Sequence, residues 1–363
     1  MIRKAGAAVS VTPQQKLLAA EVGELLDGGK LALVGTPCIC GLPGDDKAIA
    51  QVDRYGLPLQ TLVCLACGTV RANPYFDEPS LKRFYEEYYQ DLYDRSPVPH
   101  AYFETQRTYG ARVLGAIRAI APESRSVVEV GCGAGGALAA IEEAGLRVAG
   151  CDHSERLVRF GQSKGIGRLV VGDMATLIDV VPDLGKVDVV YLHHVFEHIS
   201  DPAGFLKTCR SLLSSLGTLI LVVPDISRID RFPFPGGDVR LFLHIAHKYN
   251  YSQHGLELLG KAGGYSVMFI DQYESTCAPE LWAVFRPQSG VQAEAKGSSG
   301  RKMLRYLRRT ELRYRLGLLP GYQPGALPRV RRLARALLPA RVARWLSSGN
   351  AHVLRSDKRR NHE

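Results

Sequence analysis

Short apolar runs alternate with amphipathic stretches between residues 122 and 288 of the chain. The runs have strand length, and the stretches between them place apolar residues at helical spacing. This alternation is typical of an α/β fold built on a largely parallel sheet. The predicted strands are Val127–Val130, Arg147–Cys151, Leu169–Val171, Val187–Leu192, Thr218–Val223, Ser266–Asp271 and Leu281–Phe285. The predicted helices are Gly136–Ala144, Glu155–Ser163, Pro202–Ser215 and Gln253–Ala262.

The pattern on either side of this region is different and predicts further segments. A helix begins after Thr12, and Gly28 and Gly29 end it. A second helical stretch, Tyr102–Ile120, leads into the first strand of the α/β region. The chain is therefore divided into an N-terminal helix (1–29), a small cysteine module (30–75), a helical connector (76–121), an α/β domain (122–288), a linker (289–300) and a basic helical tail (301–363).

Composition places the chain among globular proteins. Its 363 residues are 46% apolar, which is enough for a substantial core. The longest apolar run, near Leu219–Val223, is much shorter than the ~20 residues of a membrane span. The first residues lack the apolar region of a signal peptide. We therefore expect a cytoplasmic protein.

The net charge of +10 is distributed unevenly along the chain. Residues 301–363 contain 17 basic and 3 acidic residues, a net charge of +14, whereas residues 1–300 carry a net charge of −4. Within the tail, Val330, Leu333, Leu337 and Leu338 form an apolar stripe with arginines beside it. Three interpretations stay open: the stripe packs on the body of the protein, it contacts an anionic membrane surface as a peripheral anchor, or the tail binds nucleic acid.

A glycine-rich turn follows the first predicted strand of the α/β region. Gly131, Gly133 and Gly135 let the backbone approach a ligand at the start of the next helix. Glu129 is unexpected, because a strand buried on both faces is normally apolar throughout. A turn without a ligand is the simplest alternative. A nicotinamide-dependent dehydrogenase is another, since glycines 131, 133 and 136 followed by Asp152 fit the dinucleotide fingerprint.

The order acidic-x-Gly-x-Gly-x-Gly resembles the first motif of class I S-adenosylmethionine-dependent methyltransferases. The segment from Val187 to Pro202 resembles the strand-four motif of a large bacterial family of these enzymes. The resemblance implies a Rossmann-like sheet of seven strands with an antiparallel last strand. It also implies that S-adenosylmethionine lies across the carboxyl ends of the strands, where open α/β sheets bind ligands.

The resemblance assigns cofactor contacts by position. Gly131, Gly133 and Gly135 would approach the methionine portion, and Glu129 its amino group. Asp152 would accept both ribose hydroxyls, a task that suits the two oxygens of a carboxylate. Asp173 would contact the adenine amino group, while Met174 packs on the ring. Asp152 as an ordinary turn residue is the alternative.

Histidines follow the strand that ends at Leu192. His193 and His194 should stand at the carboxyl edge of the sheet, lining the cofactor or acceptor pocket. His247 and Tyr251 belong to a segment that resembles the His-x-aromatic-x-aromatic-Ser motif of the same family, and they are candidates for acceptor contact or general base. Histidine is suited to proton removal near neutral pH. Structural packing is the alternative for each side chain.

Cysteines cluster in two pairs in the N-terminal module. Cys38, Cys40, Cys64 and Cys67 have the grouping of a structural zinc site with four sulfur ligands. The first pair is Cys-x-Cys, one residue shorter than the common spacing, so Cys38 departs most from the pattern. Four unliganded thiols are the alternative. A zinc-ribbon-like module ahead of a methyltransferase domain resembles bacterial sugar and natural-product methyltransferases.

These features predict an enzyme that transfers a methyl group from S-adenosylmethionine to a small molecule. The expected acceptor is a sugar, a nucleotide-linked sugar or a related metabolite, deprotonated with the help of a histidine. One alternative is an RNA methyltransferase that uses the basic tail, although the acidic body argues against it. The other is the NAD-dependent dehydrogenase. The acceptor atom and the oligomeric state are not predicted.

Overall fold

The computed structural model describes residues 7–42, 45–93, 99–181, 185–231, 238–274, 279–288 and 299–316. The apolar stripe of the tail, which starts at Val330, lies outside these residues. So does the segment 232–237.

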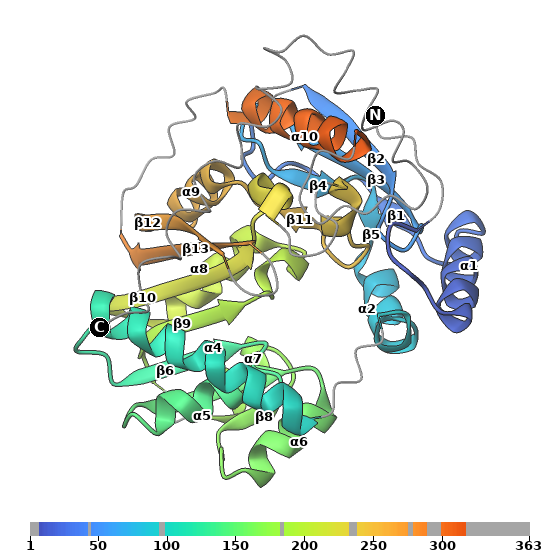
Figure 1. Cartoon of the computed structure of the whole chain (residues 1–363). Helices are drawn as coiled ribbons and strands as arrows, with labels where there is room; N and C mark the ends of the chain where they lie inside the picture. The colour runs from blue at the N-terminus through green and yellow to red at the C-terminus, as the bar shows by residue number, and fades with distance from the viewer. Residues whose placement is uncertain are drawn as a thin grey trace, which may run out of the picture.

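A sheet of seven strands forms the centre of the α/β domain (Figure 1), as predicted. Its strands in spatial order are β12 (Tyr265–Glu274), β13 (Pro279–Pro287), β10 (Leu213–Pro224), β9 (Val187–His193), β6 (Ser126–Val130), β7 (Arg147–Asp152) and β8 (Leu169–Val171). The strands from β10 to β8 run parallel to their neighbours. The last strand, β13, is antiparallel to both β10 and β12, which confirms the predicted orientation.

Helices cover both faces of this sheet, so the domain has three layers. One face packs on α4 (Pro99–Ile120), α5 (Gly136–Glu142) and α6 (Glu155–Ser163). The other packs on α7 (Met174–Val180), α8 (Pro202–Leu212) and α9 (Gln253–Ala262). Burial on two sides explains why the strands have nearly continuous apolar sequences.

Two elements of this domain differ from the sequence prediction. The helix predicted over Pro202–Ser215 ends at Leu212, because Leu213 is buried and pairs with Val187 at the start of β10. Helix α7 was not predicted. Asp173 caps it by accepting a hydrogen bond from the backbone N–H of Thr176. With only seven residues, the helix is too short to show a clear apolar periodicity in the sequence.

The N-terminal part forms a second hydrophobic core around small sheets. Its helices are α1 (Pro13–Asp27), α2 (Glu78–Glu87) and α3 (Tyr89–Leu92), and its two-stranded sheet joins β1 (Leu33–Val34) to β5 (Tyr75–Phe76). Its four-stranded sheet has the order β11 (Tyr249–Asn250), β4 (Val70–Ala72), β3 (Pro58–Cys64) and β2 (Asp46–Val52). Strand β11 comes from the methyltransferase-like domain, so the two parts share this sheet.

Helix α10 (Ser299–Arg315) is the described part of the basic tail, and it lies across the N-terminal sheet (Figure 1). Met303 and Leu307 are buried in the N-terminal core, and the Tyr306 hydroxyl donates to Asp230 at 2.6 Å. None of the helices within the described ranges is both long and apolar enough to cross a bilayer.

Candidate active site

The glycine turn connects β6 to α5 at the carboxyl edge of the sheet. Gly131, Gly133 and Gly135 all have positive φ angles, of 73°, 54° and 74°, which L-residues with side chains rarely adopt. A Cβ atom on Gly131 would come within 2.3 Å of Val195 Cγ2. The turn therefore needs glycine both for its backbone conformation and for its close contact with the segment that follows β9.

Helix α4 holds the glycine turn through one buried side chain. Gln106 Nε2 donates to the carbonyl oxygen of Cys132 at 2.8 Å, and Gln106 Oε1 accepts the N–H groups of Ala134 and Gly136 at 3.0 and 3.4 Å. The sequence analysis missed this residue, because nothing in the helical pattern distinguishes it from an exposed glutamine.

Glu129 is 2% exposed in the centre of the sheet. Its Oε2 atom is buried and has no hydrogen-bond partner among the described residues. Burial raises the pKa of Glu129 well above its usual value, and the nearby Asp152 carboxylate raises it further. Such a carboxylate fits a cationic group of a ligand, and the methionine ammonium of S-adenosylmethionine is one.

Asp152 ends β7 beside the glycine turn. Its Oδ2 accepts the N–H of Gly133 at 2.9 Å and its Oδ1 accepts that of Ser154 at 2.8 Å. Burial raises its pKa, although both backbone hydrogen bonds oppose this shift. Each carboxylate oxygen can accept a second hydrogen bond, so the residue fits a pair of ribose hydroxyls.

Asp173 and Met174 lie at the start of α7. The N–H of Thr176 lowers the pKa of Asp173, whose Oδ1 it contacts at 2.9 Å. Met174 is 3% exposed and packs in the core on that side of the sheet. The cap already occupies one oxygen of Asp173, which leaves the other for a ligand.

The two predicted edge histidines meet a carboxylate from β13. His193 Nε2 and His194 Nε2 lie 3.4 and 3.5 Å from the same atom, Glu280 Oε1. The second oxygen of Glu280 accepts the Trp282 indole N–H at 3.1 Å. Glu280 was not predicted, because its partners are some 87 residues earlier in the chain.

A second group of histidines and tyrosines gathers where three segments meet. His198 belongs to the 3₁₀ helix η2 (Phe196–His198), and its Nδ1 lies 2.8 Å from the Tyr85 hydroxyl of α2. The ring of His247 lies 4.5 Å from those of His198 and His244, measured between ring centres. The structure thus brings His247 beside His198.

Tyr251 is placed differently. It is fully buried, stacks on Phe196 and donates its hydroxyl hydrogen to the Phe196 carbonyl oxygen at 3.2 Å. These contacts are those of a core residue that fixes the segment after β9.

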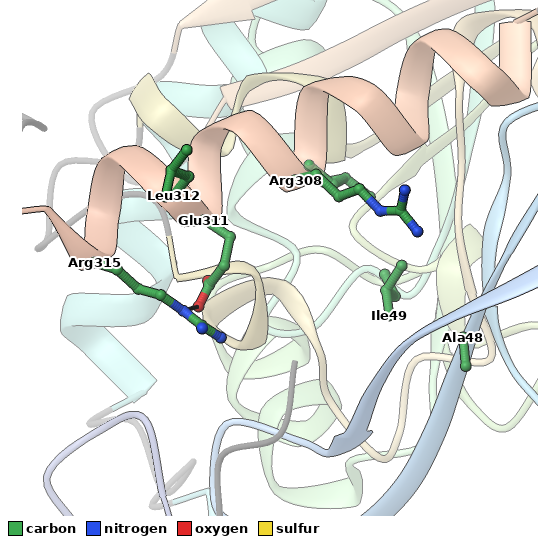
Figure 2. Close-up of a pocket in the computed structure, with 7 residues that line it drawn as sticks. Ala48, Ile49, Arg308, Glu311, Leu312 and Arg315 are labelled. Carbon is green, nitrogen blue, oxygen red and sulfur yellow. Dashed lines mark hydrogen bonds and ion pairs between the residues drawn. The ribbon is translucent and has the colours of Figure 1, made fainter. Parts of the chain in front are cut away.

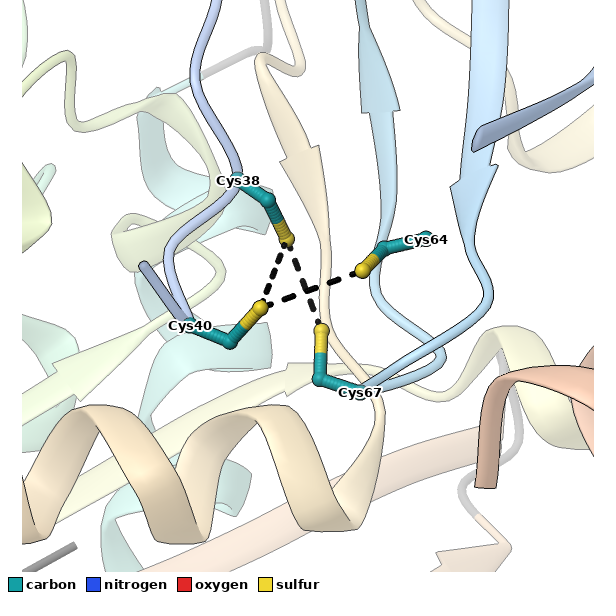
Figure 3. Close-up of side chains that lie close together, drawn as sticks. All are labelled: Cys38, Cys40, Cys64 and Cys67. Carbon is teal, nitrogen blue, oxygen red and sulfur yellow. Dashed lines mark hydrogen bonds between the residues drawn. The ribbon is translucent and has the colours of Figure 1, made fainter. Parts of the chain in front are cut away.

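The four cysteines of the N-terminal module converge on one point (Figure 3). The sulfur–sulfur distances are 3.5 Å for Cys38–Cys67, 3.5 Å for Cys38–Cys40 and 3.8 Å for Cys40–Cys64. Four sulfurs around a tetrahedral zinc ion, with bonds of about 2.3 Å, would lie about 3.8 Å apart. The short first pair therefore does not prevent Cys38 from reaching the other three.

Helix α10 lines a separate pocket of about 180 Å³ against β2 (Figure 2). Ala48 and Ile49 form one wall, and Arg308, Glu311 and Arg315 come from the helix. None of the predicted cofactor, catalytic or metal residues lines it.

The strand order, the glycine turn and the carboxylates on β6 and β7 agree with the resemblance to class I S-adenosylmethionine-dependent methyltransferases. A family model described as "Methyltransferase domain" matches residues 128–221, which span β6 to β10. The match supports the methyltransferase prediction for these residues and gives no support to the dehydrogenase interpretation.

Known proteins resemble part of the chain. The ubiquinone biosynthesis O-methyltransferase of Ralstonia nicotianae is 28% identical over 135 residues, which are 36% of this chain and 57% of that protein. The solved structure of the mitomycin 7-O-methyltransferase MmcR is 17% identical with a TM-score of 0.42, over 57% of this chain and 60% of that one. The magnesium protoporphyrin IX methyltransferase of Synechocystis is 16% identical with a TM-score of 0.42, over 58% of this chain and all of that one.

Proposed function

We propose that the protein transfers the methyl group of S-adenosylmethionine to a hydroxyl or carbon of a small molecule, namely a sugar, a nucleotide-linked sugar or a related metabolite. The observation that carries this proposal is the group of Tyr85, His198 and His247 beyond the end of β9. Aromatic faces can pack on the C–H groups of a sugar, while imidazole and phenol groups bind its hydroxyls.

His247 is the proposed general base. S-adenosylmethionine supplies a methyl group already activated by its positive sulfur, so the protein mainly has to orient the acceptor and take up its proton. The His247 imidazole would take up the proton of the acceptor, and S-adenosylmethionine, when bound, would supply the methyl group. The Tyr85–His198 hydrogen bond would keep His198 in place beside the acceptor.

The test uses the full-length protein, labelled S-adenosylmethionine and a panel of nucleotide sugars, with mass spectrometry of the products. His247→Gln should lower kcat by about 10²–10⁴-fold, the usual contribution of a general base, and leave binding of S-adenosylhomocysteine unchanged. The control is His254→Gln on α9, a half-buried histidine outside the group. Methylation of RNA and not of any metabolite would favour the nucleic-acid alternative.

We also propose that Cys38, Cys40, Cys64 and Cys67 hold one structural Zn²⁺. Their spacing supports this, and so does the N–H of Thr69, which donates to Cys67 Sγ at 3.4 Å. Donors of this kind stabilise a thiolate ligand. When bound, the ion would tie the loop that follows β1 to the turn that follows β3.

Finally, we propose that the exposed face of α10 contributes to contact with an anionic membrane surface. Arg301, Arg305 and Arg308 are exposed on one side of this helix, and Leu312 on the same side is 50% exposed. Each basic group near such a surface contributes about 1 kcal/mol. Charge reversal at the three arginines should abolish sedimentation with phosphatidylserine vesicles at low salt. Retained sedimentation would contradict the role of α10.

A further inference from the structure

The cluster of His193, His194 and Glu280 lies at the carboxyl edge of the sheet, next to the glycine turn. Val130 on β6 is paired with Leu192 on β9, so His193 stands level with Gly131 on the neighbouring strand. Val195 touches Gly131, which holds the segment after His194 against the turn. The cluster is therefore beside the expected position of the methionine portion of the cofactor.

The distances within the cluster are long for hydrogen bonds. Imidazole nitrogens that donate to a carboxylate usually lie 2.7–2.9 Å from it when the bond is charge-assisted. Here both nitrogens lie 3.4–3.5 Å from one oxygen. Two nitrogens and an oxygen bound to one tetrahedral ion at about 2.1 Å would be about 3.4 Å apart.

The backbone also adopts an uncommon conformation at this point. His194 has a φ of 54°, and it is the one non-glycine residue with positive φ in the described part of the chain. A side chain in this region is strained, and such residues concentrate at functional sites. This conformation directs the Nε2 atom of His194 toward Glu280 Oε1, which the Nε2 atom of the adjacent His193 also faces.

Charge and access at the cluster are suited to a cation. Glu280 is 1% exposed, whereas the side chains of His193 and His194 are 16% and 34% exposed. Arg112 of α4 lies over the rings of Tyr109 and Tyr273, and among the described residues no ion pair joins it to Glu280. The carboxylate is thus buried behind the two imidazoles, which face the accessible side.

We propose that His193, His194 and Glu280 form a binding site for one divalent transition-metal ion. Two imidazoles and a carboxylate are a donor set that suits zinc, iron, cobalt or nickel, and in catalytic sites they leave a coordination position open. The role of the ion rests on the proposed function: its open position takes the oxygen of the acceptor hydroxyl and makes the hydroxyl proton easier to remove.

The test measures metal content and binding of S-adenosylhomocysteine separately, in the full-length protein. After loading with Co²⁺ and dialysis, elemental analysis should find one ion fewer per chain in Glu280→Gln than in the wild type. This variant keeps an oxygen for the Trp282 N–H, and His194→Gln provides a second variant should the first fail to fold. The absorption that each variant loses relative to the wild type should not include the thiolate-to-cobalt charge-transfer band of a cysteine site.

Asp225→Asn is the matched control, because Asp225 is an equally buried carboxylate that belongs to none of the groups of potential metal ligands in the described part of the chain. Its cobalt content should equal that of the wild type. Equal cobalt in Glu280→Gln, His194→Gln and wild type would overturn the proposal. Binding of S-adenosylhomocysteine is measured on every sample. If the wild type does not bind S-adenosylhomocysteine, the proposed function is wrong. The cobalt content of the variants tests the metal site alone.

Discussion

Asp53, in the turn between β2 and β3, accepts a hydrogen bond from the backbone N–H of Ile245, which lies 192 positions later in the chain. The Asp53 carboxylate also accepts the N–H groups of Tyr55 and Leu57 at 2.8 and 2.9 Å. One buried side chain thus joins the N-terminal sheet to the segment that carries His244 and His247.

This connection predicts a specific pH dependence of stability. Burial raises the pKa of Asp53 to about 6 from 3.8, so the folded protein binds this proton more tightly than the unfolded chain does. The contribution of the group to stability is therefore greatest below pH 4 and declines as the pH rises to 6. As the pH rises from 4 to 7, the free energy of unfolding of the wild type should fall by about 2 kcal/mol relative to that of Asp53→Asn. A difference between the two proteins that stays constant across this range would contradict the prediction.

Binding of the cofactor product should release a proton from Glu129. Burial raises the pKa of this carboxyl, so it keeps its proton to a higher pH than an exposed glutamate does, and a bound ammonium group favours the ionised form. Affinity should therefore rise with pH through the range in which free Glu129 titrates. Calorimetry of S-adenosylhomocysteine in buffers of different ionisation enthalpy measures the proton released. The same measurement on Glu129→Gln should show no such release, and equal release in both proteins would assign it to another group.

Asp152 and Asp173 should differ in their effect on cofactor binding. Asp152→Ala removes two hydrogen bonds from a charged acceptor, each worth about 1.5–3 kcal/mol, and it also frees the N–H of Gly133. Asp173→Ala removes a helix cap and one contact, so we expect a smaller loss of affinity. Titration calorimetry on both variants compares them directly, and a larger loss for Asp173→Ala would reverse our assignment.

Gln106→Ala should weaken the glycine turn without touching the ligand. The substitution leaves two buried N–H groups and one carbonyl without their side-chain partner, so the free energy of unfolding should fall by about 2–4 kcal/mol. Affinity for S-adenosylhomocysteine should fall as well, because the turn loses its preformed shape. Arg107→Ala, at the exposed neighbouring position, is the control. Equal stability of the two variants, measured by urea denaturation, would show that α4 does not support the turn.

Cys64→Ser should remove zinc from the N-terminal module and lower its thermal stability. A bound ion would join the loop after β1 to the turn after β3, so its binding would contribute to the folding free energy of the module. Cys209→Ser on α8 changes another buried thiol, far from the cluster in sequence, and should keep the zinc. Elemental analysis and differential scanning calorimetry give both quantities. Wild-type protein that carries no zinc after purification from zinc-containing medium would refute the site.

The sequence predicted the α/β domain well because its signals are local. The strand from Val127 has apolar positions on both faces, and the glycines after Val130 mark the turn directly. The contact between Glu280 and the two histidines could not be predicted, because it depends on the register in which β13 pairs with β10. The length of α8 was overestimated because its last turn and the start of β10 are equally apolar.

Strand β11 gives the N-terminal sheet its last partner, and it consists of Tyr249 and Asn250. During synthesis, the ribosome therefore completes most of the catalytic domain before the N-terminal sheet can close. Until then the backbone N–H and C=O groups on the outer edge of β4 have no strand partner. Nascent chains can aggregate through such an unpaired strand edge. Early binding of an ion by the cysteines would protect the module during this interval. Folding of the newly made chain is thus expected to depend on the supply of metal, even under conditions in which the folded protein stays intact after the ion is removed.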